Sequence, residues 1–257
     1  MHTDPGPTSF VGALNAELWV EDGATRGRVA VLPEMLAPGT DRVRMGVLAT
    51  LVDLVAGSLP SGPVNPTVDL RVSLIGRPPA TGTISLVCHP AKVGRRLFVG
   101  ETLLHTGDER RPFARATTTF MNELIPGVTG VGPPTAPVGA PSFDDLLRPR
   151  AGDRGAVEVD PHPWVSNGVG GTIQGGALAL LAEIAAERAV EDATGEVAEV
   201  VDLDIRYVNR VRAGPVAASA EASPREFGDF LVRVAITDLG DGGRLVSIVS
   251  LVCRPTG

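Results

Sequence analysis

The feature that most constrains the fold of this chain is an internal repeat. Three sequence blocks of the first half recur in the same order in the second half. The pairs are 26–33 with 154–161, 46–53 with 176–183, and 68–75 with 201–208, at offsets of 128, 130 and 133 residues. The offset rises by only a few residues from the first block to the third, as short loop insertions between two copies would produce. Three matches in the same order indicate duplication.

Each half has the same predicted order of elements. A short strand (27–32; 156–160) precedes a helix (45–58; 173–193), and a run of strands follows. The strands are 67–75, 83–89, 97–105 and 113–123 in the first half, and 198–208, 215–222, 227–238 and 244–254 in the second. This order predicts an α+β fold, in which the long helix of each half packs its apolar side against an antiparallel sheet.

A Gly/Pro-rich segment near the middle of the chain predicts the boundary between the copies. It lacks any hydrophobic period. We therefore expect an N-terminal unit at 1–125, a linker at 126–150 and a C-terminal unit at 151–257.

Composition excludes several classes of function. The formal net charge of −7 argues against a general nucleic-acid binder, which needs a basic surface. The two cysteines have no C-x-x-C spacing and the four histidines are scattered, so we expect no metal site. The N-terminus lacks the apolar stretch of a signal peptide, and no stretch is long enough to span a bilayer. We therefore expect a cytoplasmic protein without membrane contact.

One glycine-rich segment, 166–183, carries the strongest chemical signal. It does not match a phosphate-binding loop, because Gly176 stands where that motif requires lysine. The glycines lead directly into a predicted helix, whose first N–H groups are unpaired and lie at the positive end of the helix dipole. Gly175 and Gly176 would let a polarised carbonyl approach these N–H groups. The structural alternative for this glycine pair is tight packing of the helix.

Two acids occupy matching positions of the two helices. Asp53 and Glu183 both stand among apolar neighbours, where burial would raise their pKa and suit them to act as base or nucleophile. A helix-face acid paired with an arginine is the alternative for Asp53. Glu183 has a stronger alternative, because it shares an i, i+4, i+8 spacing with Glu187 and Glu191 and could belong to a solvated stripe.

Helix geometry limits how these groups can cooperate. Gly175 and Glu183 are about 12 Å apart along one helix, at roughly 1.5 Å per residue, so they cannot act on the same carbonyl. If the two helices pack antiparallel around a pseudo-two-fold axis, each helix start meets the acid of the other helix. One composite site then pairs Gly175 and Gly176 with Asp53, and the other pairs Gly46 with Glu183.

The segment 174–183, followed by 201–208, resembles the hot-dog fold acyl-CoA thioesterases, and the phenylacetate-pathway type in particular. The resemblance covers both halves and implies a tandem double hot-dog. It further implies that a backbone N–H at the Gly-Gly turn polarises the thioester carbonyl. A carboxylate from the facing unit would attack that carbonyl or activate water.

The chain departs from the pattern of this family at several positions. The family histidine before Gly-Gly is replaced by Gln174 in the second half and by Arg44 in the first. The first half has Met45 before Gly46 in place of a glycine pair. Asn167 is displaced by one residue from the family asparagine, and an Asx turn is an equal interpretation for it. We expect at most one efficient site, at Gly175, Gly176 and Asp53.

The leading hypothesis is therefore hydrolysis of an acyl-CoA or acyl-carrier thioester, with coenzyme A as part of the substrate and no metal or redox cofactor. Arg210 and Arg212 are candidates for binding coenzyme A phosphates, although an ordinary surface charge is the stronger interpretation for one of them. The main alternative is a non-catalytic acyl-CoA-binding protein on the same fold. A hydratase and a purely structural interaction module are weaker alternatives. A homodimer of tandem repeats is an expectation by analogy.

Overall fold

The computed structural model describes residues 9–58, 66–121, 142–166 and 172–256.

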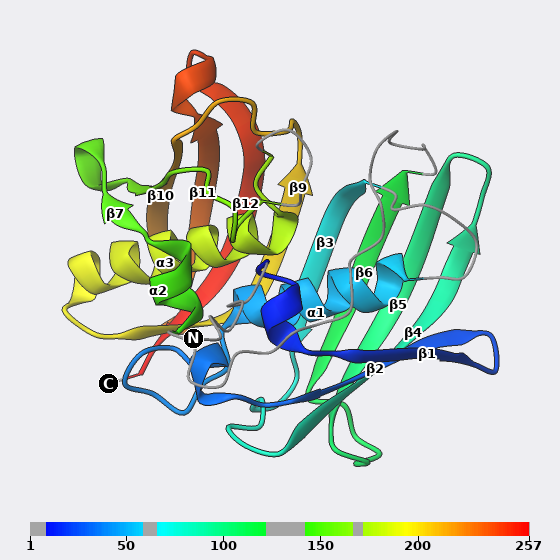
Figure 1. Cartoon of the computed structure of the whole chain (residues 1–257). Helices are drawn as coiled ribbons and strands as arrows, with labels where there is room; N and C mark the ends of the chain where they lie inside the picture. The colour runs from blue at the N-terminus through cyan, green and yellow to red at the C-terminus, as the bar shows by residue number, and fades with distance from the viewer. Residues whose placement is uncertain (1–8, 59–65, 122–141, 167–171, 257) are drawn as a thin grey trace, which may run out of the picture.

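Within these residues, twelve strands form one continuous antiparallel sheet. The strand order is β1-β2-β4-β5-β6-β3-β9-β12-β11-β10-β8-β7 (Figure 1). The first half contributes β1 (Glu17–Glu21), β2 (Ala24–Ala30), β3 (Thr67–Leu74), β4 (Thr83–Val93), β5 (Leu97–Thr106) and β6 (Ala114–Met121). The second half contributes β7 (Arg150–Ala151), β8 (Val157–Val159), β9 (Ala198–Tyr207), β10 (Val216–Pro224), β11 (Phe230–Asp238) and β12 (Arg244–Pro255).

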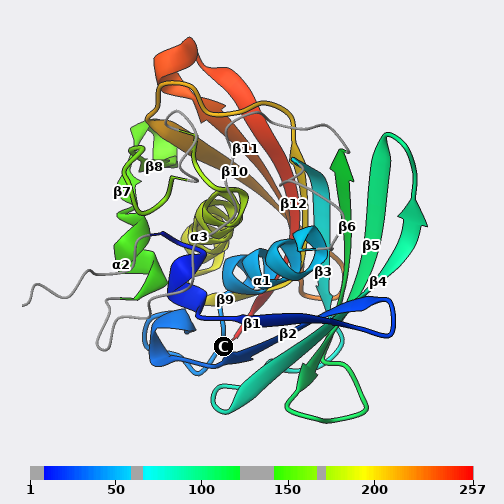
Figure 2. The ribbon, with the colours of Figure 1, turned by 45° about the vertical axis from the view of Figure 1, so that its right-hand side comes forward.

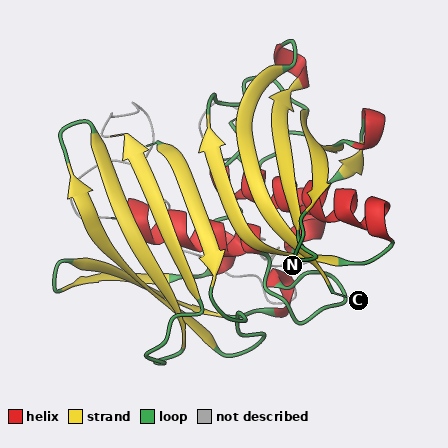
Figure 3. Ribbon diagram, turned by 180° about the vertical axis from the view of Figure 1, so that it is seen from behind, coloured by secondary structure: helices red, strands yellow, loops and turns green. Residues whose placement is uncertain are grey.

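Two main helices lie inside the curve of this sheet (Figure 2). They are α1 (Met45–Gly57) and α3 (Gly175–Thr194), and a short helix, α2 (Phe143–Leu147), packs beside α3. Seen from behind, the strands form the outer face and the helices lie beyond them (Figure 3). Short 3-10 turns occur at Gly12–Leu14, Pro33–Met35, Asp153–Gly155 and Leu239–Asp241. The helices therefore meet in the interior, where the apolar core lies.

The sheet has the symmetry that the sequence repeat predicts. Read from its two ends, the strand order pairs β1 with β7, β2 with β8, β4 with β10, and so on to β3 and β9 at the centre. At the central joint, Leu70 pairs with Ile205 and Val72 with Leu203. The Arg71–Asp204 pair lies between them, and the sequence offset relates these two residues to each other. A pseudo-two-fold axis therefore passes through the β3–β9 joint.

The same symmetry governs the contact between the helices. A Cβ atom at Gly46 would lie 2.5 Å from the Leu180 Cα, and a Cβ atom at Gly176 would lie 1.9 Å from the Thr50 Oγ1. Gly46 and Gly176 are repeat equivalents, as are Thr50 and Leu180. Each glycine therefore allows the first turn of its helix to touch the middle of the other helix.

The predicted α+β class is confirmed, with both long helices and the four-strand run of each half present. The sequence pattern does not predict β1, β7 or α2, which are short elements. α2 lies inside the range assigned to the linker, and residues 122–141 of that range are outside the described residues. The unit boundaries stay a prediction.

Candidate functional site

The start of α1 is occupied by a carboxylate of the protein itself. Glu183, from the middle of α3, accepts the N–H of Met45 at 2.9 Å and the N–H of Gly46 at 2.8 Å, one with each oxygen. These N–H groups are among those that a helix start leaves unpaired. The structure thus brings Glu183 to Gly46, as the pseudo-two-fold arrangement requires.

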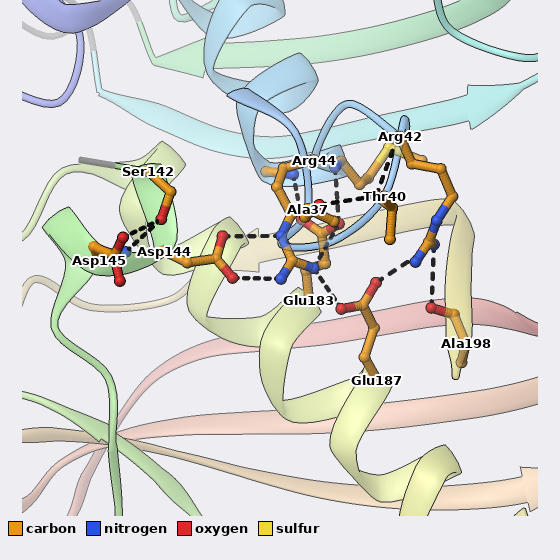
Figure 4. A network of polar contacts seen from close by, with 12 residues as sticks. Ala37, Thr40, Arg42, Arg44, Ser142, Asp144, Asp145, Glu183, Glu187 and Ala198 are labelled. Atoms are coloured by element: carbon orange, nitrogen blue, oxygen red, sulfur yellow. Dashed lines mark hydrogen bonds and ion pairs between the residues drawn. The ribbon is translucent and has the colours of Figure 1, made fainter. Parts of the chain in front are cut away.

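Arg44 connects this carboxylate to a buried ionic cluster (Figure 4). Its Nη1 lies 3.6 Å from Glu183 and donates to Glu187, and its Nε donates to Asp144 of α2 at 2.9 Å. Arg42 lies 3.9 Å from Glu187. Arg44 is 5% exposed and Glu183 is 3% exposed. The α1 start is therefore closed by protein groups.

The alternative interpretation of Glu183 as part of a solvated stripe is wrong. Glu191 is exposed and Glu187 is partly buried, but Glu183 is buried against the α1 start. Burial raises the pKa of Glu183, against the opposing effects of Arg44 and the two backbone donors, which favour its ionised form. The i, i+4, i+8 spacing alone does not distinguish a solvated stripe from a face that the start of α1 covers, whereas the repeat predicts that Gly46 meets Glu183.

The start of α3 is arranged differently. Gln174 is the N-cap, and its Oε1 accepts the N–H of Ala177 at 3.1 Å. Within the part of the chain that the structure describes, no group accepts the N–H of Gly175 or Gly176. Gly175 is partly exposed, whereas its repeat equivalent Met45 is buried. Among the described residues, the first two N–H groups of α3 thus lack a protein acceptor, with Gly175 partly exposed and Gly176 buried.

Asp53 approaches this start from α1. It stands one helical turn beyond Thr50, which touches Gly176. The Thr67 hydroxyl donates to the Asp53 Oδ1 at 2.5 Å. Burial raises the pKa of Asp53 to about 6, against the lowering effect of this hydrogen bond. An acid with this pKa is ionised at neutral pH and can still accept and return a proton.

Tyr207, at the end of β9, joins the two parts of this site. Its hydroxyl donates to the Gly175 carbonyl oxygen at 3.0 Å. Burial and the charge of Asp53 raise the pKa of Tyr207 well above its usual value, so the phenol lies within electrostatic reach of Asp53. The sequence does not single out Tyr207 or Thr67 as site residues, since single hydroxyls in strands belong to no motif.

The two arginine candidates lie beside the segment that leads into α3. The Thr172 Oγ1 donates to the Val211 carbonyl oxygen at 3.5 Å, which brings the β9–β10 connection to this segment. Arg210 and Arg212 flank Val211, and both are exposed. Arg212 lies 3.9 Å from Asp241. Asn167 lies outside the described residues.

The described residues contain neither a cluster of metal-ligating side chains nor a membrane-spanning helix. No group of three or more His, Cys, Asp or Glu side chains among them could hold a metal ion. None of their helices combines the length and apolar character needed to cross a membrane.

Comparison with solved structures identifies the architecture as a tandem double hot-dog fold. The TesB protein of Mycobacterium avium subsp. paratuberculosis matches with a TM-score of 0.70 at 15% identity, over 96% of this chain and 98% of that chain. The acyl-CoA thioesterase II TesB2 of Mycobacterium marinum matches with a TM-score of 0.62 at 15% identity, over 95% and 97%. The 12:0-ACP thioesterase of Umbellularia californica matches with a TM-score of 0.61 at 13% identity, over 91% and 94%.

Sequence comparisons gave no match. No family model matches the chain, and no curated protein matches it. The chain is thus similar in structure to hot-dog thioesterases at low identity, which establishes the fold. The phenylacetate-pathway subtype stays a prediction.

Proposed function

We propose that this protein hydrolyses an acyl thioester at the start of α3, with Asp53 as the reacting acid. The observation that carries the proposal is the pair of N–H groups at Gly175 and Gly176, which have no acceptor among the described residues and lie where α3 crosses α1 at Thr50, one helical turn before Asp53. Donors of this kind stabilise the negative charge that develops on a carbonyl oxygen under attack. The thioesterases among the structural matches support the same reaction class.

The proposed reaction begins with the thioester carbonyl oxygen accepting the N–H groups of Gly175 and Gly176. Asp53 takes a proton from water as the water oxygen attacks the carbonyl carbon. The tetrahedral intermediate then breaks its C–S bond, and the leaving thiolate receives the proton from Asp53. The products are a carboxylic acid and a thiol, and the enzyme returns to its first state. Thr67 holds one Asp53 oxygen and leaves the other for the water.

Direct attack by Asp53 is the other form of this mechanism, and it passes through a mixed anhydride. A single turnover in ¹⁸O-labelled water separates the two forms. Label found in Asp53 establishes direct attack with hydrolysis of the anhydride at the Asp53 carboxyl carbon, whereas base catalysis places the label only in the acid product.

The substrate we propose is an acyl-CoA. Arg210 and Arg212 are exposed beside the segment that leads into α3, and guanidinium groups suit phosphate contact. An acyl-carrier thioester is the alternative, and it presents one phosphodiester in place of the coenzyme A phosphates.

The test is turnover on short, medium, long and aromatic acyl-CoAs, with Asp53→Asn and Glu183→Gln beside the wild type. Asp53→Asn is expected to lower kcat by about 10²–10⁴-fold, the usual contribution of a positioned base. Glu183→Gln is expected to keep kcat within about threefold, because Glu183 is bound to the α1 start. Loss of turnover only in Glu183→Gln would move the active site to α1.

A binding protein without turnover is the second candidate, and Gln174 favours it. The family histidine can titrate, whereas Gln174 cannot, and its Oε1 caps the helix. Tight acyl-CoA binding with no hydrolysis of any substrate would establish this alternative.

A further inference from the structure

Tyr207 makes a contact that the proposed reaction does not use. Its hydroxyl donates to the Gly175 carbonyl oxygen at 3.0 Å. That carbonyl and the N–H of Gly176 belong to the same peptide group. A hydrogen bond to the C=O of a peptide increases the polarity of its N–H, because hydrogen bonds in series polarise one another.

We propose that Tyr207 is a positioning residue that polarises the Gly175–Gly176 peptide and so strengthens the Gly176 N–H as a donor to the thioester carbonyl. The inference rests on the proposed function, since it assigns the Gly176 N–H to the substrate. Tyr207 thus becomes the third component of the proposed site, beside Asp53 and the Gly175–Gly176 pair.

The packing at Gly175 supports a defined position for this phenol. A Cβ atom at Gly175 would lie 3.0 Å from the Tyr207 hydroxyl oxygen and 3.1 Å from the ring carbon that carries it. Glycine therefore allows the ring to lie directly against the first residue of α3. The role of Gly175 at this point is to admit Tyr207 as much as to admit a ligand.

The closed helix start has no such group. The repeat equivalents of Tyr207 and Gly175 are Leu74 and Met45, at the offsets of their sequence blocks. Leucine has no hydroxyl to donate to the Met45 carbonyl. The hydroxyl is thus present only at the start where Gly175 and Gly176 have no acceptor among the described residues.

Asp53 and Tyr207 are also linked through charge. The charge of Asp53 contributes to the raised pKa of the phenol, after burial. We therefore expect ionisation of Asp53 to change the environment of the Tyr207 ring as well. This link can be observed without any turnover.

The first experiment uses the fact that the chain has a single tyrosine. Tyrosine labelled with ¹³C at the hydroxyl-bearing carbon gives one resonance, which needs no assignment. We expect its shift to titrate with a midpoint near pH 6, the pKa of Asp53, and to lose this step in Asp53→Asn. A shift that stays constant from pH 4 to pH 9 would overturn the link, whether or not the protein hydrolyses thioesters.

The second experiment tests the polarisation itself. Tyr207→Phe is expected to lower kcat about three- to tenfold and to leave KM within about twofold, as loss of one hydrogen bond that matters in the transition state predicts. Thr194→Val is the matched control, because the Thr194 hydroxyl donates to the Val190 carbonyl at the other end of α3.

Because Tyr207 is the single tyrosine of the chain, replacing tyrosine with fluorinated tyrosine during expression changes only this residue. Fluorination makes the phenol hydroxyl a stronger hydrogen-bond donor. We expect kcat to rise with donor acidity. Equal kcat in Tyr207→Phe and Thr194→Val, or no response to fluorination in an active enzyme, would leave Tyr207 a structural residue and overturn the proposal.

Discussion

The starts of α1 and α3 are repeat equivalents, yet a carboxylate of the protein occupies the first, whereas the second has no acceptor for its first two N–H groups among the described residues. At α1, Glu183 places both oxygens on backbone N–H groups, and Arg44 joins it to a buried cluster. At α3, Asp53 occupies the equivalent position and is held by Thr67 instead. The aspartate side chain is one methylene shorter than that of glutamate. The difference teaches that a small change in side-chain length can decide whether a carboxylate caps the facing helix start or leaves its first N–H groups without that cap.

The largest expected effect concerns the glycines at which the helices cross. Gly46→Ala should lower the free energy of unfolding by more than about 3 kcal/mol, because the new Cβ meets the Leu180 backbone, which cannot turn away. Gly176→Ala meets the Thr50 side chain first, so it should cost about 1–3 kcal/mol, and Thr50→Ala should recover part of this loss. Urea unfolding measures both. If Gly46→Ala and Gly176→Ala lowered the free energy of unfolding equally, and Thr50→Ala recovered none of the loss in Gly176→Ala, the proposed difference between the two helix contacts would be wrong.

The next effect concerns the closed start. Glu183→Gln should lower the free energy of unfolding by about 2–3 kcal/mol, because Arg44 loses one of its buried partners and one backbone donor loses its acceptor. Asp53→Asn should cause no comparable loss at pH 8. Chemical denaturation of the two variants tests this, and a greater loss in Asp53→Asn would reverse the roles of the two acids.

The α3 start should show a pH dependence of stability. The pKa of Asp53 is about 6 in the folded protein and 3.8 without perturbation, so the folded state binds more protons between these values. The contribution of Asp53 to the free energy of unfolding therefore falls as the pH rises from about 4 to 6. The free energy of unfolding of Asp53→Asn should therefore be higher than that of the wild type by about 1–2 kcal/mol at pH 8, after allowance for solvent screening. At pH 3.5 the two proteins should be equally stable. Thermal unfolding at the two pH values measures this, and an equal difference at both would contradict it.

The smallest effect concerns substrate binding. Arg210→Ala and Arg212→Ala should each raise KM for acyl-CoA about three- to tenfold, since a charge-assisted hydrogen bond contributes about 1 kcal/mol at an exposed site. Neither should change KM for an acyl-pantetheine, which lacks the phosphates. Steady-state kinetics on both substrates test this. Equal changes on both would assign the arginines another role.

Much of this architecture follows from the sequence, and the parts that do not have physical reasons. The repeat predicted the two helices, the strand runs and the meeting of Gly46 with Glu183. The sequence did not predict Arg44 as the centre of a cluster, because its partners come from α2 and α3, far along the chain. Tyr207 and Thr67 act through single hydroxyls, whose partners only the crossing of the helices and strands determines.

The measurement that tests the central claim most directly is a crystal structure with a ketone analogue of an acyl-CoA, in which a methylene replaces the sulfur. We expect one analogue per chain, with its carbonyl oxygen within hydrogen-bond distance of the Gly175 and Gly176 N–H groups and with Glu183 still bound to Met45 and Gly46. An analogue carbonyl at the α1 start, with Glu183 displaced, would contradict the account.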